Sequence, residues 1–191
     1  VKLGIVRHGV KGITDFTVVR GDIPVVSVDA YYMINEKTGY IRVKNFGEQT
    51  YAEMLVALAE LNIEGMEGLV VDLRGNTGGY MHIAIQMANE FLPKDRLIVY
   101  TEGRKSPREE FNSDGRGTFQ TLPLVVLVDE ASASSSEIFA GAIQDNDRGT
   151  IVGRRTFGKG LVQQPVEFRD GSVVRLTIAR YYTPSGRCIQ K

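Results

Sequence analysis

A chain of 191 residues is long enough for one well-buried core, so one main domain is expected. Its hydrophobic fraction of 42%, with 8 Tyr and 8 Phe, is typical of a globular protein and excludes a disordered or fibrous one. Lys plus Arg and Asp plus Glu both number 23, so no nucleic-acid partner is expected, because the chain lacks the large basic field that one requires.

The N-terminal part of the chain favours short strands. Four segments there are rich in strand-forming residues and are separated by turn signals: 2–7, 15–20, 25–34 and 40–46. Gly21 and Pro24 divide the first pair from the second. The chain begins VKLGIVRHG, without Met or a signal-peptide core, and no run of 18 apolar residues follows, so we expect a fragment of a longer protein.

Two strand-to-helix units are predicted in the middle of the chain. Apolar residues recur at helical spacing over 50–61, and the apolar strand 68–73 leads through a glycine-rich turn into a helix over 81–91. The same order recurs where strand 122–128 is followed by a serine-rich start and a helix from Glu137. This pattern predicts an α/β fold with a parallel sheet at its core.

The remaining segments are predicted as a loop and a closing set of strands. Residues 102–118 are charged and glycine-rich, which indicates an exposed loop and the most mobile segment of the chain. Strands are expected over 150–152, 161–168 and 172–182, the last two forming a hairpin across Arg169-Asp170-Gly171.

The serine-rich segment ASASSSE is the first candidate for chemistry. It lies between a buried strand and a helix, at the edge where open α/β sheets bind ligands. Ser134 and Glu137 also fit a helix capping box, which is the structural alternative. Ser132, Ser134, Ser135 and Ser136 can divide the nucleophilic and capping roles, and their spacing alone does not identify the attacking hydroxyl.

A lysine between two glycines is the second candidate. The segment TFGKG places Lys159 after a short strand, where a solvated turn lysine is the structural alternative. To act as a base this amine must be desolvated, and Phe157, Val162 and the strand 150–152 are the apolar surface expected to bury it. Gly153 to Lys159 also has the spacing of a phosphate-binding loop, but Gly160 replaces its hydroxyl residue and a strand follows, which argues against nucleotide binding.

The glycine-rich turn DLRGNTGG is the third candidate, because its backbone amides could face an anion, whereas its structural alternative is a tight crossover. His8 and His82 are the only histidines, and His82 is kept as a reserve base. Cys188 is single, so no internal disulfide forms. No metal and no cofactor are predicted, since neither a histidine pair nor a cysteine pair has ligand spacing.

In this order, the motifs DLRGNTGG, SASSSE and QDNDRGTIVGRRTFGKGLVQ resemble those of the C-terminal processing, or tail-specific, peptidases, which use a Ser-Lys dyad. The resemblance implies Ser134 as nucleophile, Lys159 as general base and Gln163 as its orienting partner. It also implies an oxyanion hole at Gly78 and the amide of Ser135.

Two further residues, Gln144 and Asp145, match the family's Q-D segment. Asp145 has no assigned catalytic role, and a structural role, capping or pairing with Arg148 is expected. Ser135 stands where the family usually has alanine, and Thr77 where proline is common.

The resemblance covers roughly Val25 to the end and implies a βα core of the crotonase and Clp-protease type with flanking β-hairpins. It implies that residues 1–20 are the last strands of a truncated PDZ domain and that 21–191 are the catalytic core. Protein or peptide substrates with accessible C-termini and an extracytoplasmic location are implied, and any membrane association would come from a preceding region. The oligomeric state is not predicted.

The predicted function is therefore a serine endopeptidase acting through an acyl-enzyme on Ser134. A non-catalytic or autoinhibited peptide-binding module of the same fold is the alternative. Acyl-CoA chemistry of the crotonase type would need a pocket for the nucleotide and acidic catalytic groups at the two oxyanion turns, and neither is identified in the sequence.

Overall fold

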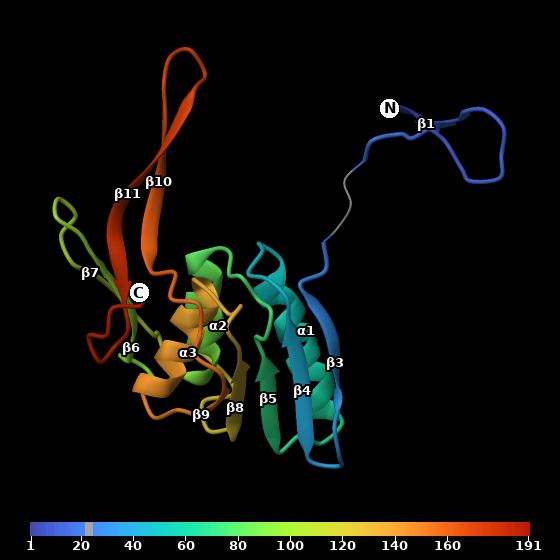
Figure 1. The fold of residues 1–191 in the computed structure, drawn as a ribbon. Coiled ribbons are helices and arrows are strands. Elements are labelled where there is room, and N and C mark those ends of the chain that lie inside the picture. Colours follow the sequence, from blue (N-terminus) through green and yellow to red (C-terminus); the bar gives the residue numbers. More distant parts are fainter. Residues whose placement is uncertain (22–24) are drawn as a thin grey trace.

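The computed structural model describes residues 1–21 and 25–191, so the break predicted at Pro24 lies outside the described residues. Near the N-terminus, β1 (Lys2–Ile5) and β2 (Thr14–Thr17) form an antiparallel hairpin that pairs with no other described strand. Figure 1 shows this hairpin apart from the rest of the chain. Its assignment to a PDZ domain stays a prediction.

A five-stranded sheet forms the centre of the fold, in the order β3-β4-β5-β8-β9. Its strands are β3 (Val28–Met33), β4 (Thr38–Val43), β5 (Gly68–Asp72), β8 (Leu124–Val128) and β9 (Thr150–Gly153). Neighbours from β4 to β9 run parallel, and only β3 is antiparallel to its partner. The predicted parallel core is confirmed, and parallel strands bring the turns after β5 and β8 to one edge.

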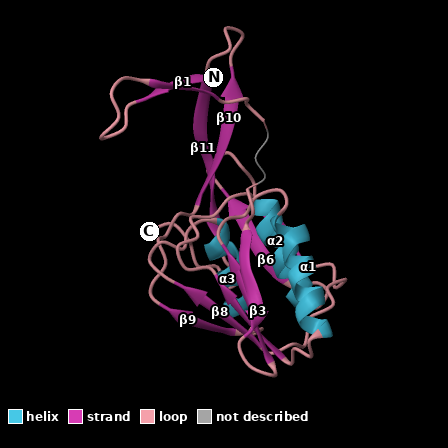
Figure 2. Cartoon of the chain, turned by 90° about the vertical axis from the view of Figure 1, so that its right-hand side faces the viewer, coloured by secondary structure: helices cyan, strands magenta, loops and turns pink. Residues whose placement is uncertain are grey.

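Three helices cover this sheet: α1 (Thr50–Ile63), α2 (Met81–Phe91) and α3 (Ser135–Asp145). Their predicted positions are confirmed. The first two bury an apolar stripe of helical period, whereas α3 is buried on all sides from Ser135 to Ile143. The rings of Phe91 and Phe139 meet edge to face at 6.1 Å between α2 and α3. Figure 2 shows the helices beside the central strands.

A second sheet lies on the other side of α3, in the order β10-β11-β6-β7. Its strands are β6 (Leu97–Glu102), β7 (Glu109–Asn112), β10 (Leu161–Glu167) and β11 (Val173–Tyr182). The predicted closing hairpin is confirmed as β10 and β11, which project beyond the core in Figure 2. Because α3 contacts both β6 and β9, it is held between the two sheets.

The prediction that residues 102–118 form only an exposed loop is wrong. Residues 109–112 form β7, which pairs with β6, and β6 itself was not predicted. Phe111 is the one apolar residue of β7, so periodicity could not reveal a strand whose order comes from non-local pairing with β6.

Arg148 joins the segments around the end of α2. Its guanidinium donates to the carbonyls of Phe91 at 2.7 Å, Phe119 at 2.7 Å and Leu122 at 2.6 Å. Burial lowers the pKa of this side chain. The predicted pairing of Arg148 with Asp145 is wrong, because the guanidinium donates its hydrogen bonds to these main-chain carbonyls instead.

We predict that Arg148→Met lowers the free energy of unfolding by about 2 kcal/mol, because three carbonyls lose a charged donor. Urea denaturation followed by circular dichroism measures the change. The matched control is Arg116→Met, whose parent side chain is 89% exposed and should tolerate the change. Equal stability of the two variants would contradict the role given to Arg148.

Candidate active site

Two turns meet at the carboxyl edge of the central sheet. The glycine turn, residues 73–79, follows β5, and the serine turn, residues 129–134, follows β8. Since β5 and β8 are paired neighbours, both turns leave the sheet side by side. The amide of Ala133 donates to the carbonyl of Asn76 at 3.0 Å, so the two turns are in direct contact.

Three of the four candidate serines bind the two turns together. Their hydroxyls donate to carbonyls of the glycine turn, with distances of 2.8 Å from Ser132 to Leu73, 2.9 Å from Ser135 to Gly79 and 2.9 Å from Ser136 to Asn76. These three serines are at most 1% exposed. Ser134 is the partly exposed one, so burial separates the structural serines from the accessible one, which spacing alone could not do.

Ser134 has an unusual main-chain conformation at the start of α3. Its φ of 56° and ψ of −113° lie in a region that side-chain-bearing residues rarely adopt. Such conformations cost on the order of 1–3 kcal/mol and cluster at functional sites. A methyl group on Gly78 would lie 2.7 Å from the Cβ of Ser134, so only glycine fits opposite this residue.

We predict that Gly78→Ala destabilises the fold, because the new methyl meets Ser134 and the carbonyl of Ala133 at 2.7 Å. Gly75→Ala is the matched control, since Gly75 also has positive φ but has nothing within 4 Å of a new methyl. Thermal melts of both variants measure the difference. Equal effects would assign the loss to backbone strain alone.

Glu137 connects the serine turn to the segment that carries Lys159. We call this segment, residues 156–160, the lysine turn. The predicted capping box of Ser134 and Glu137 is present. The carboxylate accepts the amide of Ser134 at 2.9 Å, that of Gly158 at 2.6 Å and that of Lys159 at 2.8 Å. With the residue only 6% exposed, these bonds offset the desolvation of the carboxylate and fix the two main chains relative to each other.

The side chain of Lys159 is placed differently from the prediction. Lys159 is exposed, and Phe157, which was expected to cover it, is itself 58% exposed. The hydroxyl of Ser134 and the amine of Lys159 form no hydrogen bond in the described structure. The predicted burial is wrong, because Phe157 turns to solvent and Val162 is only half-buried. The structure therefore fixes the main chain of Lys159 through Glu137 and leaves its side chain exposed.

Gln163 is exposed on β10, next to an irregularity in the pairing of β10 with β11 between Val162 and Gln163. Such irregularities re-aim neighbouring side chains. Gln163 lies four residues beyond Lys159, on the strand that follows the lysine turn.

The amides expected to form the oxyanion hole differ in availability. The amide of Ser135 lies in the first turn of α3, where helix amides lack internal partners. The amide of Gly78 instead donates to Oδ1 of Asn76 at 2.9 Å, and Asn76 is fully buried. The carbonyl of Gly79 faces Ser135, whereas the carbonyl of Gly78 faces Phe46.

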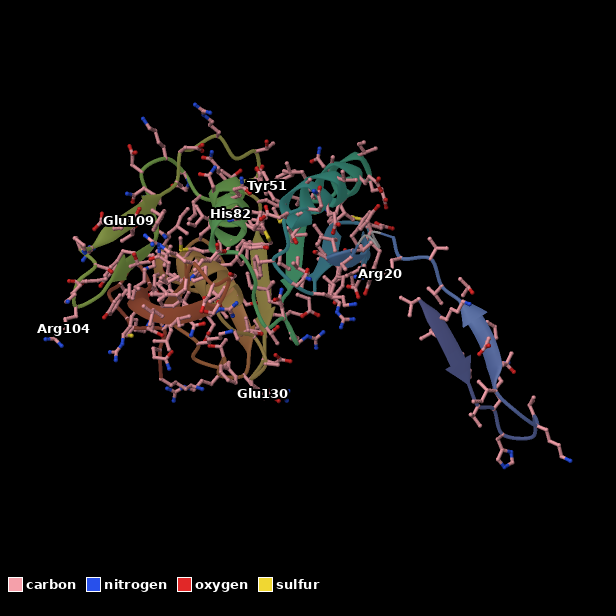
Figure 3. The ribbon with its side chains drawn as sticks, turned by 90° about the horizontal axis from the view of Figure 1, so that it is seen from above. Arg20, Tyr51, His82, Arg104, Glu109 and Glu130 are labelled. Carbon is pink, nitrogen blue, oxygen red and sulfur yellow. The ribbon has the colours of Figure 1, made fainter. Side chains whose placement is uncertain are left out.

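His82, the reserve base, lies at the start of α2 (Figure 3). Its side chain is 54% exposed and contacts the carboxylate of Glu48 at 3.2 Å. Its ring also packs at 5.4 Å from that of Tyr80. Among residues 1–21 and 25–191, no group of three or more His, Cys, Asp or Glu is arranged to hold a metal ion.

Asp129 fixes the base of the serine turn. Its Oδ1 accepts the amides of Gly75 at 3.0 Å, Ala131 at 3.0 Å and Ser132 at 3.1 Å. Burial alone would raise the pKa of this carboxyl, but the hydrogen bonds outweigh burial and hold the pKa below its usual value.

We predict a loss of stability in acid that depends on Asp129. A lowered pKa in the folded state stabilises the protein above the unfolded pKa of about 4, and this contribution is lost as the pH falls through the folded pKa. Melting temperatures between pH 2 and pH 6 for the parent and Asp129→Asn measure it. The variant should show a shallower dependence below about pH 4, and identical curves would contradict the assignment.

Comparison with known proteins places the chain in a family. Residues 37–191 match peptidase family S41, and the chain belongs to that family. It is 40% identical to a carboxyl-terminal-processing protease of Synechocystis, over 100% of this chain and 45% of the relative. It is also 38% identical to the carboxy-terminal processing protease CtpA of Bacillus subtilis, over 100% of this chain and 40% of the relative.

A solved structure supports the same assignment. The photosystem II D1 C-terminal processing protease matches with a TM-score of 0.80 and 34% identity, over 93% of this chain and 49% of that chain. The predicted α/β class is confirmed by this match. The chain spans less than half the length of these relatives. Within the described residues, each helix is too short or too polar to span a bilayer.

Proposed function

We propose that this chain is the catalytic core of a serine endopeptidase that cleaves proteins near their C-termini. The observation that carries the proposal is the arrangement of the serine turn. Three serines are buried in contacts with the glycine turn, and Ser134 alone is accessible, in a strained conformation at a helix start. The names of the S41 relatives support the reaction class.

In the proposed mechanism, the Oγ of Ser134 attacks the substrate carbonyl while neutral Lys159 takes the hydroxyl proton. The resulting ammonium of Lys159 then protonates the leaving nitrogen, and water hydrolyses the acyl-enzyme. The amide of Glu137 also donates to the main-chain carbonyl of Ser134 at 2.9 Å, so it keeps a partner when the hydroxyl turns to the substrate. Gln163 would orient the amine through its amide oxygen.

The oxyanion would be held by main-chain amides of the two turns. Each donor contributes on the order of 3 kcal/mol to transition-state stabilisation. The amide of Ser135 is one donor. For Gly78 to be the other, the bond from its amide to Asn76 must open.

The exposed amine of Lys159 favours a second candidate function. A lysine base works only when desolvated, so the described residues alone are in a resting or binding-only arrangement. In the full-length protein, a bound substrate or another segment would cover the amine. Without such a cover, the chain would bind peptides without cutting them.

The substrates are proposed to be proteins or peptides with accessible C-termini, in a compartment outside the cytoplasm. Two relatives carry the word chloroplastic in their names, those of Tetradesmus obliquus and Arabidopsis thaliana. No cofactor takes part in the proposed reaction. Any membrane association and a preceding PDZ domain belong to the same proposal.

Cleavage of casein by a full-length form should be abolished by Ser134→Ala and by Lys159→Ala, because one loses the nucleophile and the other the base. Loss of a nucleophile or base in such sites typically lowers kcat by a factor of about 10⁴ or more. Fluorescent casein peptides measure the rates.

Two control variants separate the readings. Arg155→Ala removes an exposed charge from the same loop as Lys159 and should cleave at the parent rate. His82→Ala should also stay active. Activity surviving in Lys159→Ala but lost in His82→Ala would replace the dyad by a histidine base, and an inactive parent enzyme would favour the binding module.

A further inference from the structure

The segment that follows β11 runs back along α3, and none of its residues has a role in the proposed mechanism. We call residues 183–191 the strap. It begins with a turn in which the amide of Thr183 donates to the carbonyl of Arg187 at 2.9 Å. It then returns beside β11, where the amide of Ile189 donates to the carbonyl of Tyr181 at 3.0 Å.

Asp145 holds the near end of the strap at the last turn of α3. Its carboxylate accepts the hydroxyl of Ser185 at 2.6 Å, the amide of Ser185 at 3.1 Å and the guanidinium of Arg187 at 2.8 Å. The Asp145 side chain is 5% exposed, against 56% for Arg187. A buried carboxylate with three donors is a fixed anchor.

The far end of the strap reaches the lysine turn. The amide of Lys191 donates to the carbonyl of Gly158 at 3.2 Å, and Oε1 of Gln190 accepts the amide of Gly160 at 3.0 Å. Methyl groups on Gly158 and Gly160 would lie 2.4 Å from atoms of Lys191 and Gln190. Both glycines that flank Lys159 are therefore in close contact with the strap.

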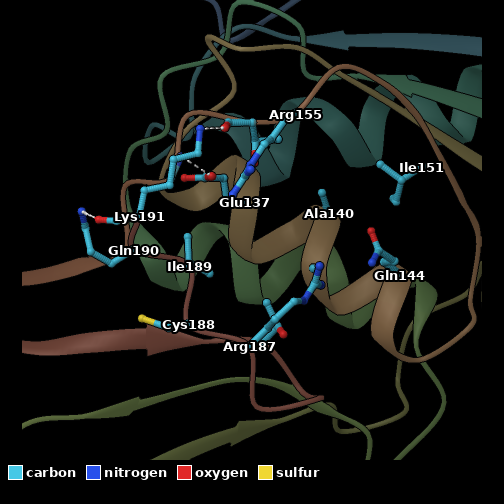
Figure 4. A pocket seen from close by; sticks show the side chains of 14 residues that line it. Glu137, Ala140, Gln144, Ile151, Arg155, Arg187, Cys188, Ile189, Gln190 and Lys191 are labelled. Carbon is cyan, nitrogen blue, oxygen red and sulfur yellow. Dashed lines mark hydrogen bonds between the residues drawn. The ribbon is translucent and has the colours of Figure 1, made fainter.

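The lysine turn is thus held by two elements. Glu137 binds the amides of Gly158 and Lys159 from the start of α3, and the strap binds Gly158 and Gly160. A cavity of about 270 Å³ lies between the strap and α3 (Figure 4). Beside it, a methyl group on Gly141 of α3 would lie 2.8 Å from Thr183, and Ile189 packs against the core. A lysine between two glycines has little conformational restriction of its own.

We propose that the strap positions Lys159 for proton transfer and that Asp145, through Ser185 and Arg187, fixes the strap. Asp145 and Gln190 are positioning residues in this account, one at each end, and neither touches the reacting atoms. The expected change in kcat rests on the proposed function, whereas the expected change in hydrogen exchange does not.

The test uses the full-length enzyme and the variants Asp145→Asn and Gln190→Ala. Each variant should lower kcat about tenfold and change KM less than about twofold. A small displacement of the base raises the reaction barrier by that amount. Because both act through one strap, the double variant should lose little more than either single variant. Asp147→Asn is the matched control, since Asp147 is exposed on the same helix end and its φ of 52° suits asparagine.

Hydrogen exchange of the amides of residues 158–160 gives a readout independent of catalysis. Exchange should accelerate there in Asp145→Asn and stay unchanged in the control. Unchanged kcat and exchange, or fully additive losses in the double variant, would overturn the proposal. If Lys159→Ala kept full activity, the proposed function would fail, and the exchange result would still decide whether the strap holds the lysine turn.

Discussion

The buried carboxylate of Glu137 is the interaction on which the rest of the site depends. It accepts amides from two turns, that of Ser134 and, 24 residues further along the chain, those of Gly158 and its neighbour Lys159. Its charge is balanced by these oriented amides and by the start of α3. One side chain therefore sets the separation of the proposed nucleophile and the proposed base at the level of their main chains.

The serine turn is likewise held by a small number of buried hydrogen bonds. A strained residue such as Ser134 persists only where its surroundings over-determine it. Buried hydroxyls at Ser132, Ser135 and Ser136 supply that constraint, together with the carboxylate of Asp129. A run of serines that appears redundant in sequence thus has one accessible member and three structural ones.

The sequence predicted the helices and the parallel core because each buries a long apolar stripe or run, a local signal. It missed β6 and β7, since β7 carries a single apolar residue and gains its order from pairing with β6. The burial of Lys159 was predicted from its apolar neighbours, but Phe157 faces solvent and Val162 is only half-buried in the fold. The partners of Asp145 lie 40 and 42 residues away, and no local pattern indicates them.

Labelling of a full-length form with a fluorophosphonate, followed by tandem mass spectrometry, tests the central claim most directly. Such reagents react with activated serine hydroxyls, so the identity of the modified residue reports the nucleophile without requiring a known substrate. The account predicts modification at Ser134 that disappears in Lys159→Ala. Modification at another serine, or equal modification of Ser134 with and without Lys159, would contradict it.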